Sequence, residues 1–299
     1  MKKWAFLLVI LLLLFGFEVM KQEPEVTKDH LSIEDYLAQD VIDQGDNQAI
    51  DAIDQDDNQS IDVGMDQIYQ GDLLLVNKEY PVHQEGVTPD VINLFQNQEL
   101  VQGYGLLDNT IQLSQRVVKQ FNTMIDEAAR DGVRHFLISS GYRDEQDQNR
   151  LYEEMGSDYA LPAGYSEHNL GLSLDIGSTE MAMNKAEEGK WLQKNASTYG
   201  FILRYPKDKS AITGIQYEPW HYRYVGLPHS VIMQEKNLTL EQYLDFLKEQ
   251  KTITTTIDHE EYEISYYPIM KNTTILMPTV RRYEVSGNNI DGVIVTIHP

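Results

Sequence analysis

The chain has 299 residues, of which 41% are hydrophobic and 10% aromatic, so it can bury a catalytic core but is too polar to cross a membrane many times. Its formal net charge of −23 argues against a nucleic-acid-binding surface, and we expect no nucleic-acid partner. The absence of cysteine excludes thiol nucleophiles, disulfides, zinc–thiolate sites and iron–sulfur clusters. Any catalytic or metal chemistry must therefore use oxygen and nitrogen groups.

Residues 1–20 are typical of a membrane-targeting segment. Lys2 and Lys3 precede residues 4–17, which carry no charge, and Glu18 follows them. Two positive charges before an apolar run of this length describe the start of a secretory signal. Because no small-x-small cleavage site follows, we favour an uncleaved signal anchor over a cleaved signal peptide. This predicts a single-pass protein of the cytoplasmic cell membrane with its catalytic body on the extracytoplasmic side.

Residues 21–66 are predicted to form an acidic, disordered linker. Residues 21–70 contain 14 acidic side chains and two lysines, a local net charge of −12 (14 minus 2). The stretch at 42–48 also recurs with small changes at 53–59. The segment has few large apolar residues to offset the entropy lost on ordering, and its like charges favour an extended chain.

Residues 67–235 have the composition of a globular domain. Ser114 precedes an amphipathic helix with its apolar residues on one face, and Gly132 ends it. The elements expected next are a buried strand at 133–138, a helix that starts at Asp144 and buries Leu151 and Tyr152, a helix at 190–199 and a strand at 201–205. Helices and strands interleave without regular βαβ spacing, which predicts an α+β domain rather than a doubly wound sheet.

Residues 236–299 are predicted to form a helix followed by a small β-rich accessory subdomain. Thr239 and Gln242 make a capping box for a helix over residues 239–250. Alternating apolar residues at 253–257 and 262–266, and the apolar run at 291–297, predict strands.

Two of the eight histidines have neighbours suited to metal chemistry. His168 and Asp175 are separated by Gly171, so a turn between them can bring the two side chains together. With His221 they supply two imidazoles and one carboxylate, a set that suits Zn²⁺ and leaves a fourth position open for water. Glu218, beside His221, is placed to act on that water as general base. On spacing alone, the alternative that both histidines are hydrogen-bonded loop or core residues stays open.

A longer pattern surrounds these positions. It consists of Ser140-Gly141-Tyr142-Arg143 with Gln148, then Ser166-x-His168-x-x-Gly171-x-Ser173-x-Asp175, and then Glu218-x-Trp220-His221. This pattern resembles the zinc D,D-carboxypeptidases of the VanY type (peptidase family M15B) that occur in glycopeptide-resistance clusters. The resemblance implies a Hedgehog/D,D-peptidase-like zinc peptidase fold for residues 67–235.

The resemblance also implies the metal and catalytic roles. His168, Asp175 and His221 correspond to the zinc ligands of the family. Glu218 corresponds to its catalytic base, and Arg143 to the cation near the scissile carbonyl. The implied reaction is zinc-dependent hydrolysis of the C-terminal D-Ala from peptidoglycan stem peptides that end in D-Ala-D-Ala. Such trimming lowers the number of termini that vancomycin can bind.

Substrate contacts follow from the same resemblance. Arg143 is implied to contact the substrate carboxylate, and Gln148 and Ser166 are implied to be further substrate contacts. The implied partner is thus a peptidoglycan stem peptide.

Other classes of cell-wall enzyme can be tested against the same sequence. No serine is followed three residues later by lysine, which excludes the Ser-x-x-Lys peptidases. Thiol-dependent enzymes are excluded by the missing cysteine, and no His-Glu-x-x-His motif is present. Two alternatives stay open: an L,D-carboxypeptidase acting on tetrapeptide stems, and a noncatalytic cell-wall binding module with a structural zinc.

Overall fold

The computed structural model describes residues 58–157 and 160–299. The signal anchor predicted for residues 1–20, and residues 21–57 of the predicted linker, lie outside these ranges. Within the described ranges, no helix combines the length and the hydropathy that crossing a bilayer requires.

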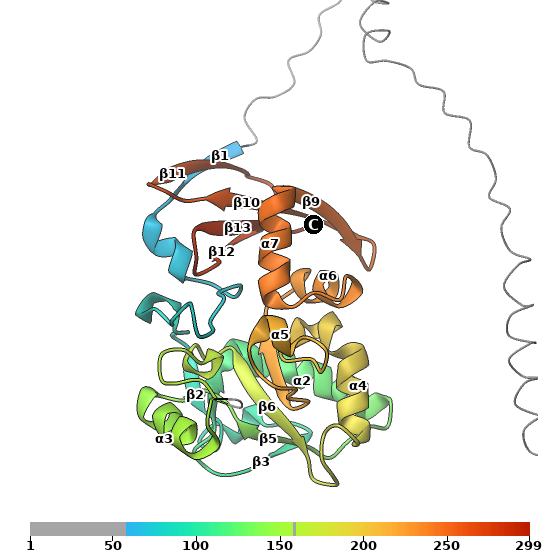
Figure 1. The fold of residues 1–299 in the computed structure, drawn as a ribbon. Helices are drawn as coiled ribbons and strands as arrows, with labels where there is room; N and C mark the ends of the chain where they lie inside the picture. The colour runs from blue at the N-terminus through green and yellow to red at the C-terminus, as the bar shows by residue number, and fades with distance from the viewer. Residues whose placement is uncertain (1–57, 158–159) are drawn as a thin grey trace, which may run out of the picture. The chain divides into compact units, whose positions relative to one another are not determined.

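A five-stranded sheet carries two of the predicted metal ligands, Asp175 and His221 (Figure 1). Its strand order is β3-β5-β6-β8-β7, with β3 parallel to β5 and all other neighbours antiparallel. The strands are β3 (Tyr104–Leu106), β5 (Phe136–Ser140), β6 (Ser173–Ser178), β7 (Phe201–Leu203) and β8 (His221–Tyr224). Asp175 on β6 is the register partner of His221 on β8, so strand pairing alone places two predicted ligands side by side.

Helix α2 (Gln115–Arg130) supplies most of the apolar surface that packs on this sheet. It begins where the sequence predicts, because the Ser114 hydroxyl accepts a hydrogen bond from the Val117 N–H at 3.4 Å. Its buried face joins one core with Phe136 and Leu174 of the sheet. Helix α4 (Glu187–Asn195), which continues as a 3-10 turn over Ala196–Tyr199, adds Trp191 and Leu192 to this core. Two further helices are α5 (Ser210–Thr213) and α6 (His229–Glu235). Short strands β2 (Val91–Asn93) and β4 (Gln112–Ser114) pair beside α2.

Helix α3 (Glu145–Met155) is confirmed in position, but the predicted buried face is wrong. Asp144 caps it by accepting a hydrogen bond from the Asp147 N–H at 2.8 Å. Gln148 is the buried side chain of this helix, whereas Leu151 and Tyr152 are partly exposed. The reason is that α3 lies at the rim of a cleft that Leu151 lines, rather than over the core.

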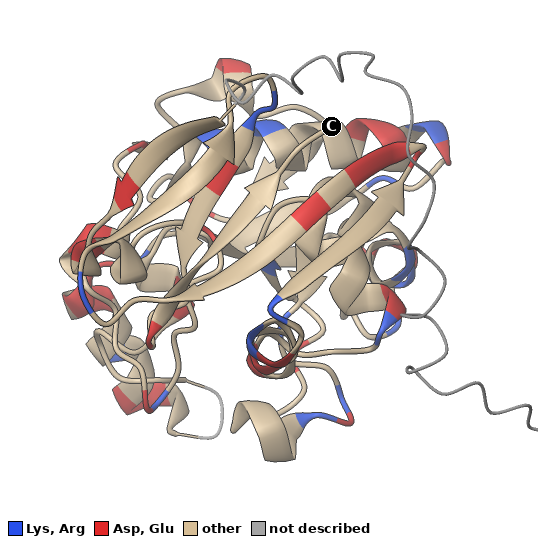
Figure 2. Cartoon of the chain, turned by 90° about the horizontal axis from the view of Figure 1, so that it is seen from above, with Lys and Arg blue, Asp and Glu red and all other residues tan. Residues whose placement is uncertain are grey.

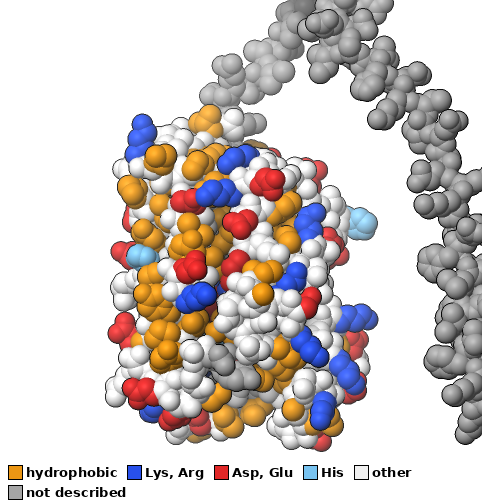
Figure 3. Space-filling view, in the orientation of Figure 1, with side chains coloured by type: hydrophobic (Ala, Val, Ile, Leu, Met, Phe, Trp, Pro, Cys, Tyr) orange, Lys and Arg blue, Asp and Glu red, His pale blue; other side chains and the backbone are white. Residues whose placement is uncertain are grey.

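The C-terminal part is built on a four-stranded antiparallel sheet, ordered β12-β13-β10-β9. The strands are β9 (Thr252–Ile257), β10 (Glu260–Pro268), β12 (Tyr283–Gly287) and β13 (Gly292–Ile297). Helix α7 (Leu240–Gln250) packs its buried residues against this sheet and begins with the predicted capping box at Thr239. Figure 2 marks the positions of Asp and Glu along the strands and helices of this end, and Figure 3 shows charged side chains of both signs among hydrophobic ones.

Residues 58–66 correct the predicted linker, which ends earlier than the composition indicates. β1 (Asn58–Val63) pairs antiparallel with β11 (Thr273–Pro278), and a 3-10 turn over Met65–Tyr69 follows it. Val63 and Ile68 are buried in one core with residues of β11 and β13. Composition fails here because a few alternating apolar residues suffice for an edge strand when its partner comes from the far end of the chain. The C-terminal sheet subdomain therefore contains residues from both ends of the described chain.

Candidate active site

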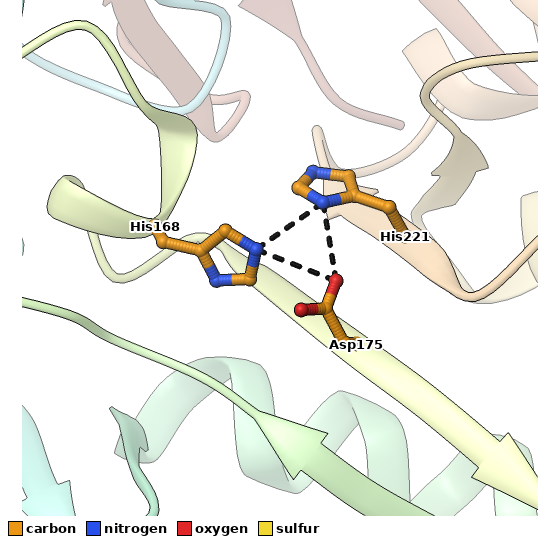
Figure 4. A group of neighbouring side chains, drawn as sticks. All are labelled: His168, Asp175 and His221. Carbon is orange, nitrogen blue, oxygen red and sulfur yellow. Dashed lines mark hydrogen bonds and ion pairs between the residues drawn. The ribbon is translucent and has the colours of Figure 1, made fainter. Parts of the chain in front are cut away.

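Three side chains predicted as metal ligands meet at one point (Figure 4). His168 Nε2 lies 3.2 Å from His221 Nδ1 and 3.4 Å from Asp175 Oδ1. Asp175 Oδ1 in turn lies 3.2 Å from His221 Nδ1. The donor atoms thus form a triangle, with each residue offering one atom to the same small space.

A tight turn brings His168 to the two strand residues. His168 lies in a 3-10 turn over Glu167–Asn169, and its own N–H donates to the Ser166 hydroxyl, which caps the turn, at 3.3 Å. Gly171 follows with φ +84°, and a Cβ at this position would lie 2.5 Å from the Thr88 hydroxyl oxygen. Only glycine fits both the backbone angle and the close approach, so Gly171 turns the chain back into β6 as the spacing predicts.

The triangle fits a tetrahedral divalent metal ion. Ligand atoms about 2.0–2.1 Å from such an ion lie roughly 3.3 Å apart, which agrees with the separations of 3.2 to 3.4 Å between these donors. Asp175 Oδ1 is buried and accepts no hydrogen bond. His168 Nδ1 lies 2.6 Å from the Gly141 carbonyl oxygen and donates to it, which leaves Nε2 with a free lone pair. Burial also lowers the pKa of His168 to about 4, which keeps the ring neutral.

Glu218 lies next to the triangle without belonging to it. Its Oε2 is 3.8 Å from His221 Nδ1, and its side chain is buried. Burial raises the pKa of Glu218 to about 7, assisted by the negative charge of Asp175 and opposed by His221. A carboxylate whose pKa is close to neutral can both take up and release a proton during a reaction.

Arg143 is held in a fixed position beside the triangle. Its Nη1 donates to the Ser140 hydroxyl at 2.8 Å, and its Nε donates to Gln148 Oε1 at 2.9 Å. The same guanidinium lies 3.5 Å from Asp175 Oδ2. Gln148 also donates to the Leu161 carbonyl at 2.6 Å, so its buried amide orients Arg143 with one end and is anchored by the other.

An open cleft leads to these residues. It has a volume of about 530 Å³ and runs from β5 along α3, with all three predicted ligands, Glu218 and Arg143 on its walls. A second hollow of about 30 Å³ adjoins it and is bordered by Gln148, Ser166 and Tyr205. The structure therefore brings all seven predicted site residues to one connected space.

Three buried charged residues next to the site were not predicted from the sequence: Glu167, Arg204 and Arg223. The Glu167 side chain is fully buried, with Oε1 at 2.8 Å from both Arg204 Nε and Arg223 Nη1. Burial acts to raise the pKa of Glu167, but the two guanidinium groups hold it well below its usual range. The available signal was the position of both arginines among apolar residues, Arg204 directly after β7 and Arg223 within β8, where a buried charge needs a partner.

Comparison with known proteins identifies the family. Residues 110–227 match the family model of VanY, a D-alanyl-D-alanine carboxypeptidase. A D-alanyl-D-alanine carboxypeptidase of Enterococcus faecium is 61% identical over 234 residues, which cover 78% of this chain and 77% of that protein. The chain belongs to the VanY family. The predicted enzyme class, a carboxypeptidase acting on D-Ala-D-Ala termini, is thereby confirmed.

Two solved structures of related enzymes share the fold. The vancomycin-resistance D,D-dipeptidase VanXYg, in complex with a D-Ala-D-Ala phosphinate analog, matches with a TM-score of 0.72 and 31% identity, over 81% of this chain and 99% of that one. VanYB in complex with D-alanine-D-alanine matches with a TM-score of 0.50 and 30% identity, over 58% and 97%. The α+β peptidase fold with a C-terminal sheet is confirmed, and Zn²⁺ is the cofactor that suits the donor set of this VanY-family chain.

Proposed function

We propose that this VanY-family enzyme removes the terminal D-Ala of stem peptides with His168, Asp175 and His221 as its zinc ligands. The observation that carries this assignment is the buried Asp175 Oδ1, which accepts no hydrogen bond and faces two imidazole nitrogens at 3.2 and 3.4 Å. Zn²⁺, when bound, would polarise the scissile carbonyl and lower the pKa of a water molecule bound to the metal.

The neighbouring side chains supply the remaining chemistry. Glu218 takes a proton from the attacking water and returns it to the leaving amine of the terminal D-Ala, a role that its near-neutral pKa of about 7 supports. Arg143 stabilises the oxyanion that develops on the scissile carbonyl and pairs with the substrate carboxylate, and a single donor of this kind is typically worth about 3 kcal/mol. Gln148 acts by fixing Arg143. Ser166, which borders the smaller hollow beside Gln148, is a further substrate contact.

Substrate preference separates this function from the two alternatives left open by the sequence. The zinc-loaded protein should release D-Ala from a pentapeptide ending in D-Ala-D-Ala about 100-fold or more faster, in kcat/KM, than from a tetrapeptide ending in L-Lys-D-Ala. The released D-Ala is measured for both peptides under the same conditions. The reverse preference would identify an L,D-carboxypeptidase. Release from neither peptide by a zinc-loaded protein would identify a binding module.

We also propose that residues 1–20 anchor the enzyme in the cytoplasmic membrane with the cleft on the extracytoplasmic side. The support is the uncharged run at residues 4–17 behind Lys2 and Lys3. The proposal is tested by extracting membranes with alkaline carbonate and by adding protease to intact spheroplasts. Recovery of the protein in the carbonate-soluble fraction, or its protection from added protease, would contradict it.

Residues 21–57 are proposed to act as a spacer that contributes nothing to catalysis. In a chain without the anchor, deleting residues 21–57 should leave kcat/KM within about twofold and the Tm nearly unchanged, because the segment lacks core-forming residues. The matched comparison is deletion of residues 21–63, which also removes β1 and should lower the Tm. Equal losses in both deletions would contradict the spacer assignment.

A further inference from the structure

A line of buried charged contacts connects helix α7 with the predicted zinc site. Glu241, in the first turn of α7, accepts hydrogen bonds from Arg204 Nη1 at 3.0 Å and Nη2 at 2.7 Å. Arg204 Nε donates to Glu167 Oε1 at 2.8 Å. Glu167 Oε2 lies 3.4 Å from His221 Nε2, the ring nitrogen that faces away from His168 and Asp175.

Burial makes the geometry of this line rigid. The side chains of Arg204 and Glu167 are 0% exposed, and that of Glu241 is 15% exposed. A guanidinium that binds one carboxylate through two nitrogens and a second through Nε has its plane fixed by three hydrogen bonds. Arg223 completes the arrangement, because it also binds Glu167 Oε1 and donates to the Asp72 and Leu74 carbonyl oxygens. Glu167 therefore has one orientation in which its buried charge is satisfied.

The two histidines of the site are oriented by different acceptors. His168 donates from Nδ1 to the Gly141 carbonyl and offers Nε2 to the site. His221 has the opposite arrangement, offering Nδ1 to the site while Nε2 faces the Glu167 carboxylate. A carboxylate acceptor fixes the tautomer of a histidine ligand and makes the ring a stronger electron donor to a metal.

We propose that Glu241 and Arg204 are positioning residues for the zinc site, which act by holding Glu167 against His221 Nε2. The proposal rests on the proposed role of His221 as a zinc ligand. It assigns the C-terminal subdomain a function in metal binding, because Glu241 is placed by the packing of α7. Leu240 and Leu244 of that helix are buried in one core with Ile264 and Ile294 of the C-terminal sheet.

The test compares zinc affinity in single and double variants of the full-length chain. Zinc dissociation constants are measured by competition with a chromophoric chelator. Glu167→Gln should weaken zinc binding about 10- to 100-fold, and Glu241→Gln about 3- to 10-fold, the smaller effect reflecting action through two intermediates. Glu249→Gln, an exposed position on the same helix, is the matched control and should change nothing. Glu241→Asp, which keeps the charge, should recover part of the affinity and replaces Glu241→Gln if that variant does not fold.

The double variant Glu167→Gln/Glu241→Gln distinguishes positioning from simple structural support. If Glu241 acts through Glu167, adding Glu241→Gln to Glu167→Gln should cause no further loss of zinc affinity. The visible spectrum of the Co²⁺-substituted protein should also shift in both single variants, because it reports the ligand geometry at the metal. A Glu241→Gln variant with a lower Tm but unchanged zinc affinity and Co²⁺ spectrum would overturn the proposal. The proposal would also be overturned if Glu241→Gln lowered zinc affinity by the same factor in the unmodified protein and in the Glu167→Gln variant.

A further variant separates failure of this inference from failure of the proposed ligand set. His168→Ala, tested in the same assay, should lose zinc. If His168→Ala loses zinc while Glu241→Gln binds zinc as tightly as the unmodified protein, the proposed role of Glu241 is wrong and the ligand assignment stands. If His168→Ala keeps its zinc, the ligand assignment itself is wrong.

Discussion

Replacing Glu218 by glutamine should lower kcat about 10²- to 10⁴-fold while zinc stays bound. The amide keeps the size of the carboxylate but cannot take a proton from water or return it to the leaving amine. Because Glu218 lies outside the three-donor triangle, the metal content should stay at one ion per chain. The measurements are D-Ala release from a pentapeptide and zinc content by metal analysis on the same preparation.

The control for this substitution is Glu79→Gln, which makes the same chemical change at an exposed position. It should retain full activity and full zinc. A Glu218→Gln protein that loses its zinc would show that Glu218 is a ligand, and the assignment of Glu218 as base would be abandoned. Activity within tenfold of the unmodified enzyme would show that another group transfers the proton.

Replacing His168 by alanine should abolish stable zinc binding and, with it, measurable turnover. One of three protein donors is lost, and the remaining two face an open cleft of about 530 Å³ in which water competes for the metal. The loss is measured as zinc content after dialysis and as D-Ala release with added zinc. The thermal stabilisation that zinc gives the unmodified protein should also disappear, because a ligand that binds only the native state raises the Tm.

The matched control is His259→Asn, at an exposed loop position whose positive φ of 70° asparagine tolerates. It removes one imidazole from the chain without touching the triangle, and it should keep zinc, activity and the zinc-dependent rise in Tm. Full zinc content in His168→Ala would remove His168 from the ligand set and point to another donor.

Features that depend on neighbours in the chain were predicted well. The cap at Ser114, the capping box at Thr239 and the turn at Gly171 each act within a few residues, and the structure confirms all three. The convergence of His168 with Asp175 is of the same kind, since one turn joins them. The spacing of residues therefore predicts which side chains meet when they are close in the sequence. The family resemblance adds the more distant His221 to this group.

Features that depend on distant partners were not predicted. The composition of β1 indicates an acidic linker. Nothing near β1 in the sequence predicts a strand, because its pairing partner is Thr273–Pro278, near the other end of the chain. Glu167 lies within the VanY-like sequence pattern, but the residues near it in the sequence do not show that it forms ion pairs with Arg204 and Arg223. Burial of a charge is decided by tertiary packing, and a sequence pattern does not reveal which charges will be compensated.

The position of β1 has a mechanical consequence. β1 pairs with β11 in a two-stranded sheet that shares a core with the C-terminal sheet, at the top of Figure 1, whereas α3 and β5, which line the cleft, lie near the bottom. Tension transmitted along the polypeptide into residue 58 is borne first by the hydrogen bonds between β1 and β11. The loops that present His168 and Glu218 lie off this path. Force applied at residue 58 is therefore expected to separate β1 from β11 before it distorts the catalytic geometry.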